Sequence, residues 1–189
     1  MSGPTENLDS IAEQIRLSLA AKDAAREQAL PVCREAIRYS SQSIRAVHRH
    51  EFDQAEALLR SAERSLGEAE RALADSPEAI SSGFLRDAQK EYAEANLLLG
   101  LVTRKPVASP GDLRVDSAAY LNGLGEAVGE LRRFVLDGMR RGDLSRGEEL
   151  LAAMDDIYSV LVTIDFPDAI TGGLRRTTDM VRCPRTDAE

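Results

Sequence analysis

The sequence predicts an all-α protein, built as one bundle of six or seven helices. Aromatic residues make up only 4% of the chain and tryptophan is absent, whereas Ala, Leu, Glu and Arg, which favour helices, recur throughout. Apolar residues return every three or four positions over most of the chain, as one buried helix face requires. Because 189 residues suit one domain, we expect a single domain over 1–189, with flexible ends at 1–7 and 184–189.

The first half of the chain predicts long helices. A helical pattern runs from about 8 to 49, and Pro31 either opens a new helix at its first turn or kinks a longer one. We favour a helix over 31–49 that follows a short helix or continues the same one. A second helix is expected from Phe52 to Ala74, and a third from about Pro77 to Thr103, since Pro77 disfavours helix at the residue before it.

The second half predicts three shorter helices. Asp116 or Ser117 caps the first of them, and Gly142-Asp143 forms a turn after it. Gly172-Gly173 lies inside the last helical pattern, where we interpret it as a point of close helix packing. The expected ranges are a loop over 106–111 and helices over 116–140, from the turn to about 164, and over 167–182.

Composition excludes several classes of protein. The chain has 24 Lys+Arg against 32 Asp+Glu, a net charge of −8, which argues against an extended duplex-DNA binder but allows a local basic face. No apolar run approaches the length of a membrane span or a signal peptide, so we expect a cytoplasmic protein without a membrane partner. Two cysteines and two histidines make a His/Cys metal site nearly impossible, so any metal must be held by oxygen. Cys33 and Cys183 are expected to be small buried or interface residues.

Two pairs of carboxylates stand out by their spacing. Glu91 and Glu94 are spaced i, i+3 on the predicted third helix, and Glu126 and Glu130 are spaced i, i+4 on the fourth. The second pair shares a stripe with Gly123, whose small size lets another helix come close. If the two helices pack side by side, four carboxylates converge and must take up protons or a hard divalent cation. Two solvated acidic faces are the alternative that spacing alone leaves open.

Four arginines form a basic stripe on the predicted first long helix. Arg34, Arg38, Arg45 and Arg49 fall within an arc of about 60° at 100° per residue. Guanidinium groups in such a stripe suit contacts with the phosphates of a nucleic acid, and an exposed face of ion pairs is the alternative.

Four segments carry patterns that occur together in one family. They read REAIRYSSQSIR over 34–45, KEYAEA over 90–95, AYLNGLGEAVGELRR over 119–133 running into GDLSR, and DFPDAITGGLRR over 165–176. Together they resemble the translin family, specifically its trax-like branch, and span nearly the whole chain. The resemblance implies a translin-like helical fold that assembles into a closed oligomer.

In that family, trax is the catalytic partner of translin in a metal-dependent endoribonuclease, and its acidic residues lie on the third and fourth helices. By motif position, Glu91 and Glu94 match the Glu-Tyr-x-Glu pair, and Glu130 matches the glutamate before the leucine of the Tyr-Leu-x-Gly segment. Glu126 stands where trax proteins have an aspartate, so its arm is longer by one methylene. The resemblance thus selects the same four carboxylates as the helical spacing.

These observations predict an endoribonuclease that cleaves single-stranded RNA or unpaired RNA tails. The four glutamates would be catalytic and hold Mg²⁺ or Mn²⁺, and the arginine stripe would hold the RNA backbone. The chain resembles the compact prokaryotic, mainly archaeal, branch, which forms homo-oligomers. A nearly all-apolar stretch over 96–102 also suggests a core or subunit interface, and hence a hexamer or octamer. One alternative is a non-catalytic RNA-binding shell like translin, and another is a scaffold that binds a protein through that stretch.

Overall fold

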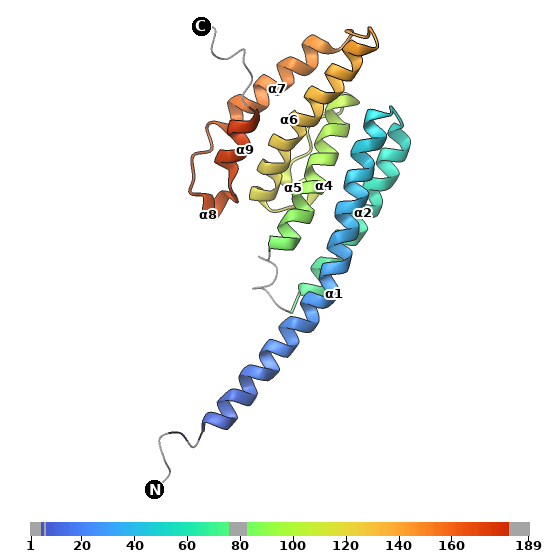
Figure 1. The fold of residues 1–189 in the computed structure, drawn as a ribbon. Coiled ribbons are helices and arrows are strands. Elements are labelled where there is room, and N and C mark those ends of the chain that lie inside the picture. The colour runs from blue at the N-terminus through green and yellow to red at the C-terminus, as the bar shows by residue number, and fades with distance from the viewer. Residues whose placement is uncertain (1–4, 6, 76–82, 182–189) are drawn as a thin grey trace.

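The computed structural model describes residue 5 and residues 7–75 and 83–181, and every regular element in this part of the chain is a helix (Figure 1). The expected flexible ends fall mostly outside the described residues, as does Cys183. The all-α prediction is confirmed. No described helix combines the length and the hydropathy that crossing a membrane requires. The helices are α1 (Leu8–His48), α2 (Phe52–Leu73), α4 (Gly83–Val102), α5 (Pro110–Leu113), α6 (Ser117–Arg140), α7 (Gly147–Leu161), α8 (Asp168–Thr171) and α9 (Leu174–Val181).

Helix α4 lies at the centre of the bundle. It packs against α1 and α2 on one side and against α6 on the other, and α7 and α9 cover α6 (Figure 1). Most of the side chains of α4 are buried for this reason, including Leu85, Tyr92 and Leu98. The sequence signal for this position is the apolar character of α4 on nearly all sides.

The apolar stretch over 96–102 is therefore part of the interior of the chain. Leu97, Leu98, Leu99 and Val102 are each at most 5% exposed without any second subunit. The prediction that this stretch is buried is confirmed, but its hydrophobicity gives no reason to expect a subunit interface. Its large apolar side chains are mostly turned into the bundle, which weakens the basis of the scaffold alternative.

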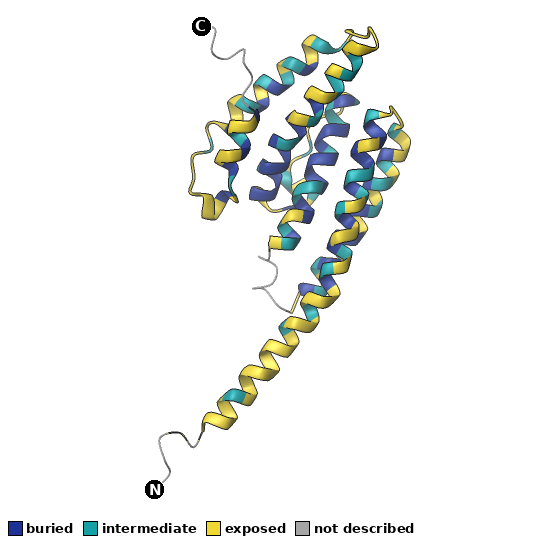
Figure 2. Cartoon of the chain, viewed as in Figure 1, coloured by how far each residue is buried: buried dark blue, intermediate teal, exposed yellow. Residues whose placement is uncertain are grey.

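Helix α1 is one continuous helix through Pro31. The helix boundary that we favoured at Pro31 is therefore wrong, and the alternative of a single longer helix is right. Proline costs a helix one hydrogen bond, and packing against neighbouring helices offsets that loss. Burial begins close to this point, at Ala29 and Cys33, and the buried state predicted for Cys33 is confirmed. Before Ala29, α1 projects beyond the bundle as an exposed helix (Figure 2).

Two boundaries in the second half differ from expectation. The predicted loop over 106–111 ends early, because Ser109 forms a capping box with Asp112 and starts the short helix α5. The predicted helix over 167–182 is two helices, since Gly172 and Gly173 adopt positive φ values of 63° and 88° and end α8. The pair is a helix stop, and the interpretation of close packing there was wrong.

The cap and the body of α6 follow the prediction. Asp116 accepts hydrogen bonds from the backbone N–H groups of Ala118 and Ala119 at 3.0 and 3.3 Å, as an N-cap does. One turn inside the helix, the buried amide of Asn122 donates to the carbonyl of Thr171 at 2.8 Å and accepts from the Thr177 hydroxyl at 2.6 Å. This satisfied polar contact fixes α8 and α9 against α6.

Gly123 sets the distance between α4 and α6. A Cβ atom at this position would lie 2.7 Å from the carbonyl oxygen of Lys90 and 2.9 Å from the backbone nitrogen of Glu94. Both are backbone atoms of α4, so no side-chain movement relieves the clash. The prediction that the small size of Gly123 lets another helix come close beside the carboxylates is therefore confirmed.

We predict that Gly123→Ala destabilises the fold by about 1–3 kcal/mol, because the added methyl forces α4 and α6 apart. Gly129 lies on the same helix with open space around its Cβ position, so Gly129→Ala should stabilise the helix by up to about 1 kcal/mol. Urea unfolding of both variants tests this. Equal stability of the two variants would contradict the close crossing.

Candidate metal centre

Three of the four predicted carboxylates meet where α4 and α6 cross. Glu91 and Glu94 project from α4 and Glu126 from α6, and one oxygen from each lies within 4.8 Å of the others. Glu94 is buried, whereas the side chains of Glu91 and Glu126 retain 27% and 29% of their exposure. The site is thus closed on the inner side and open to solvent on the outer side.

The sequence analysis missed the cation in this cluster. The Lys90 ammonium donates a hydrogen bond to Glu126 at 2.7 Å and lies 3.6 Å from Glu91. Burial lowers the pKa of Lys90, but the hydrogen bond to Glu126 and the charges of the surrounding carboxylates outweigh burial and raise it. Lys90 therefore stays charged and offsets one of three negative charges. Helical spacing could not reveal this contact, because Lys90 and Glu126 lie on different helices.

The crowding of negative charge shows in the acid–base properties of the two α4 glutamates. Burial raises the pKa of Glu94 to about 8, and the neighbouring carboxylates add to the effect. Burial also raises the pKa of Glu91, although Lys90 partly opposes it. Near neutral pH the cluster therefore holds a proton on Glu94 that a divalent cation would displace.

The fourth predicted carboxylate, Glu130, lies outside the three-residue cluster. Its carboxylate is 2.5 Å from Nε2 of His48, at the end of α1, and 3.8 Å from the Arg133 guanidinium. The contact with His48 lowers the pKa of Glu130, so Glu130 is ionised near neutral pH, at which Glu94 is protonated. Glu130 lies one helical turn from Glu126 and its charge still acts on Glu94. His48 is therefore a hydrogen-bond partner of the fourth predicted carboxylate.

The donor set suits a hard divalent cation. All three clustered groups are carboxylates, which Mg²⁺ and Mn²⁺ prefer, and their oxygens are close enough for one ion to contact several of them. Such a cation would replace Lys90 as the main counter-charge of the cluster. The three glutamates thus fit the kind of metal that the sequence predicts.

A cleft of about 380 Å³ opens beside the cluster. Lys90 and Glu126 form one wall of it, and the turn at Gly172-Gly173 forms another. Arg86 and Arg176 add two guanidinium groups to the lining, which also contains Asp87, and Arg86 lies 3.7 Å from Asp116. A cleft with cations on its walls and carboxylates at its edge can accept a phosphate next to a metal ion.

The four arginines of the predicted basic stripe are all exposed on α1. Arg38 lies 3.6 Å from Glu35 and over the ring of Tyr39, and Arg49 donates to Glu51 at 2.8 Å. The geometry is thus compatible with both interpretations of the stripe, as a phosphate-binding face and as a face of local ion pairs.

The chain is similar in sequence and in fold to several known proteins, although no family model matches it. An uncharacterized protein of Methanocaldococcus jannaschii is 31% identical over 166 residues, which cover 87% of this chain and 73% of that protein. The crystal structure of AfC3PO is 34% identical with a TM-score of 0.81, and the match covers 90% of this chain and 89% of that one.

Two further structures belong to the same group of matches. A structure of AfC3PO in complex with duplex RNA is 34% identical with a TM-score of 0.80, and covers 90% of this chain and 88% of that one. The crystal structure of apo-NeC3PO is 21% identical with a TM-score of 0.76 over 96% of this chain and 91% of that one, and it supports the fold alone.

We predict that the metal-free protein loses stability as the pH rises from about 5 to 8. Unfolded Glu94 ionises near pH 4.5, whereas folded Glu94 keeps its proton up to about pH 8. The folded state therefore binds more protons in this interval, so the free energy of unfolding falls with rising pH and levels off above it.

Glu94→Gln should remove this slope, because the amide cannot ionise, and Glu68→Gln at an exposed position of α2 should keep it. Urea unfolding at several pH values in EDTA measures the difference. A wild-type slope in Glu94→Gln would contradict the account of the cluster.

Proposed function

Since this chain belongs to the C3PO family of translin- and trax-like proteins, we propose that it is an RNA-binding, metal-dependent endoribonuclease. The observation that carries the proposal is the convergence of Glu91, Glu94 and Glu126 from two helices around one point. Clustered carboxylates in a half-buried cleft cost folding free energy through mutual repulsion, which a functional cation site explains and a solvated acidic face does not.

Glu91, Glu94 and Glu126 would hold Mg²⁺ or Mn²⁺. A bound divalent cation supplies activated water and charge stabilisation in phosphodiester hydrolysis. Glu130, kept ionised by His48, is the fourth carboxylate of the proposed site and lies beside the other three. We assign Glu130 one of two roles. It would accept a proton from the attacking water, or it would bind the metal ion as a further ligand.

Lys90 has a second role in this proposal. Lys90 donates to Glu126 and lines the adjoining cleft, so with a cation on the carboxylates its ammonium would be available to bind a phosphate oxygen of RNA there. Arg86 and Arg176 on the cleft walls would bind the flanking phosphates, and the Arg34, Arg38, Arg45 and Arg49 stripe would bind the backbone further away. We propose single-stranded RNA or unpaired RNA tails as the substrate. The binding of duplex RNA by the relative AfC3PO supports RNA as the ligand class.

A non-catalytic RNA-binding shell is the second candidate, and two observations favour it. Lys90 already offsets part of the negative charge without a metal ion. Glu126 also has a longer arm than the aspartate of trax, which changes the geometry of the site. This candidate predicts RNA binding that is sensitive to salt but indifferent to metal.

We also propose that the chain forms a closed homo-oligomer, a hexamer or octamer. The support comes from the part of α1 that projects beyond the bundle (Figure 2). Leu8, Ile11, Ile15 and Leu19 there are 42–60% exposed, and at 100° per residue they form one stripe. At 100° per residue this stripe continues the buried face of α1 that contains Ala29, Cys33 and Ile44. The core-facing side of α1 thus extends beyond the bundle, and the same face of a second copy would cover it.

We predict that Glu126→Gln abolishes Mg²⁺-dependent cleavage of labelled single-stranded RNA but retains RNA binding in EDTA. The substitution removes a charged ligand and leaves the side-chain size nearly unchanged. Glu68→Gln, on the exposed face of α2, should cleave as the wild type does. Undiminished cleavage by Glu126→Gln, or no cleavage by the wild type with either metal, would leave the RNA-binding shell as the function.

We predict that Ile15→Asp reduces the oligomer to smaller species in sedimentation velocity, because it places a charge in the centre of the exposed stripe. Leu17 is 64% exposed on the opposite side of the same helix, so Leu17→Asp is the matched control and should not change the assembly. A monomeric wild type, or equal effects of the two substitutions, would contradict the proposed interface.

A further inference from the structure

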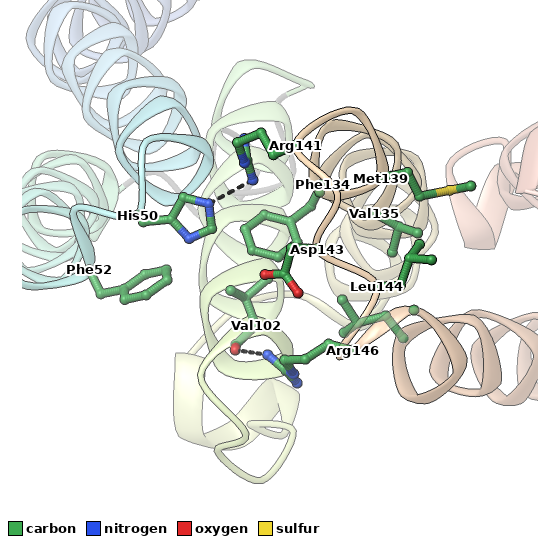
Figure 3. Close-up of a pocket in the computed structure, with 13 residues that line it drawn as sticks. His50, Phe52, Val102, Phe134, Val135, Met139, Arg141, Asp143, Leu144 and Arg146 are labelled. Carbon is green, nitrogen blue, oxygen red and sulfur yellow. Dashed lines mark hydrogen bonds between the residues drawn. The ribbon is translucent and has the colours of Figure 1, made fainter.

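A second pocket lies at the end of the bundle, outside the carboxylate cluster. It has a volume of about 250 Å³ and is formed where four segments end: the turn between α1 and α2, the ends of α4 and α6, and the start of α7. Figure 3 shows its lining, with Val102 from α4 and Phe134 from α6. None of its residues belongs to the proposed metal centre.

Aromatic rings form much of this pocket. The imidazole of His50 lies 5.1 Å from the ring of Phe134 and 5.8 Å from that of Phe52, measured between centroids (Figure 3). These are three of the few aromatic rings in a chain with only four phenylalanines and no tryptophan. The His50 ring is inclined by 76° to that of Phe52 and by 54° to that of Phe134, so a flat, unsaturated ligand in this hollow can stack on one ring and meet the others at an angle.

Polar groups at fixed positions accompany the rings. The Arg141 guanidinium bonds Nε2 of His50 at 2.9 Å, and Arg146 donates to the carbonyl of Leu101 at 3.2 Å. One carboxylate oxygen of Asp143 accepts two hydrogen bonds from Ser145, and the side chain lines the pocket (Figure 3). The pocket thus offers a hydrogen-bond acceptor inside and cationic groups at its mouth.

The local backbone holds these groups in place. His50 has a φ of 61° and Gly142, next to Asp143, a φ of 78°. A positive φ is uncommon for a residue other than glycine, and such conformations are enriched at ligand sites.

The pocket lies near both parts of the proposed RNA-binding machinery, along α6 and at the end of α1. Glu126, Glu130 and Phe134 follow one another at intervals of four residues on α6, which spans roughly 12 Å. The ring of Phe134 also lies 6.3 Å from that of His48, the partner of Glu130. On the other side, the arginine stripe of α1 ends at Arg49, the residue before His50.

From this arrangement we propose that the pocket binds one unstacked nucleobase of the RNA, a short distance from the carboxylate cluster. The base stacks on the ring of Phe52, and the rings of His50 and Phe134 line the pocket around it. Its exocyclic amine donates to Asp143, and an adjacent phosphate meets Arg141. This inference rests on the proposed function, because it assigns the substrate a second contact beside the metal centre.

The test measures binding of a fluorescein-labelled single-stranded oligoribonucleotide to the full-length protein in EDTA, so that cleavage plays no part. Loss of one stacking contact in Phe52→Leu should weaken binding roughly 5-fold or more, while the dependence on salt concentration stays unchanged because no phosphate contact is lost. Phe52→Tyr keeps the ring and should bind as the wild type does. Thermal unfolding of both variants separates loss of the ring from loss of the fold.

Oligoribonucleotides with one abasic position at successive sites give the second readout. The wild type should lose affinity at one position, and Phe52→Leu should be insensitive to the same change. Free nucleoside monophosphates form a further arm. Binding of these at the pocket with no effect of abasic positions would assign the pocket to a free nucleotide and overturn the RNA subsite.

Two other results would also overturn the inference. Equal affinities of wild type and Phe52→Leu exclude stacking, and altered sedimentation of Phe52→Leu would mean that a second copy of the chain fills the pocket. A wild type that shows the abasic dependence but no Mg²⁺-dependent cleavage would instead refute the nuclease and leave the pocket in place.

Discussion

The constraint on which the site depends is the close crossing of α4 and α6. Only a glycine at position 123 lets the backbone of α6 touch that of α4, and this contact brings Glu126 to Glu91 and Glu94. Three carboxylates at that distance repel one another, and burial makes the repulsion stronger. Lys90 offsets one charge and a proton on Glu94 offsets another, so the cluster is stable in the absence of metal but poised to exchange both for a divalent cation.

Around this acidic centre the charge of the molecule reverses. Arg86, Lys90 and Arg176 line the adjoining cleft, and the arginines of α1 are exposed beyond it. In a chain with a net charge of −8, these cations form a local exception beside the carboxylate cluster. The pair formed by His48 and Glu130 lies between this centre and the aromatic pocket, because Glu130 is one turn from Glu126 on α6 and the His48 ring is 6.3 Å from that of Phe134.

The fold and part of the site could be predicted from the sequence because they depend on local rules. Periodicity and caps predicted α2 and α6 almost to the residue. The spacing of the four glutamates predicted convergence only if the two helices pack side by side, and the structure brings Glu91, Glu94 and Glu126 together but leaves Glu130 outside the cluster. The failures involve competition between local and tertiary effects: packing keeps α1 intact through Pro31, and positive φ values break the last helix at Gly172-Gly173. Contacts between distant helices, such as those of Lys90 with Glu126 and of His48 with Glu130, leave no trace in the spacing along one helix.

The central claim is that the carboxylate cluster is a cation site whose counter-charge in the metal-free protein is Lys90. The most direct measurement is a crystal structure of the wild type grown with Mn²⁺, with the metal located from its anomalous scattering. The account predicts a peak bonded to Glu91, Glu94 and Glu126, with the Lys90 ammonium displaced from Glu126. A cluster without a peak, in which Lys90 keeps its hydrogen bond to Glu126, would contradict it.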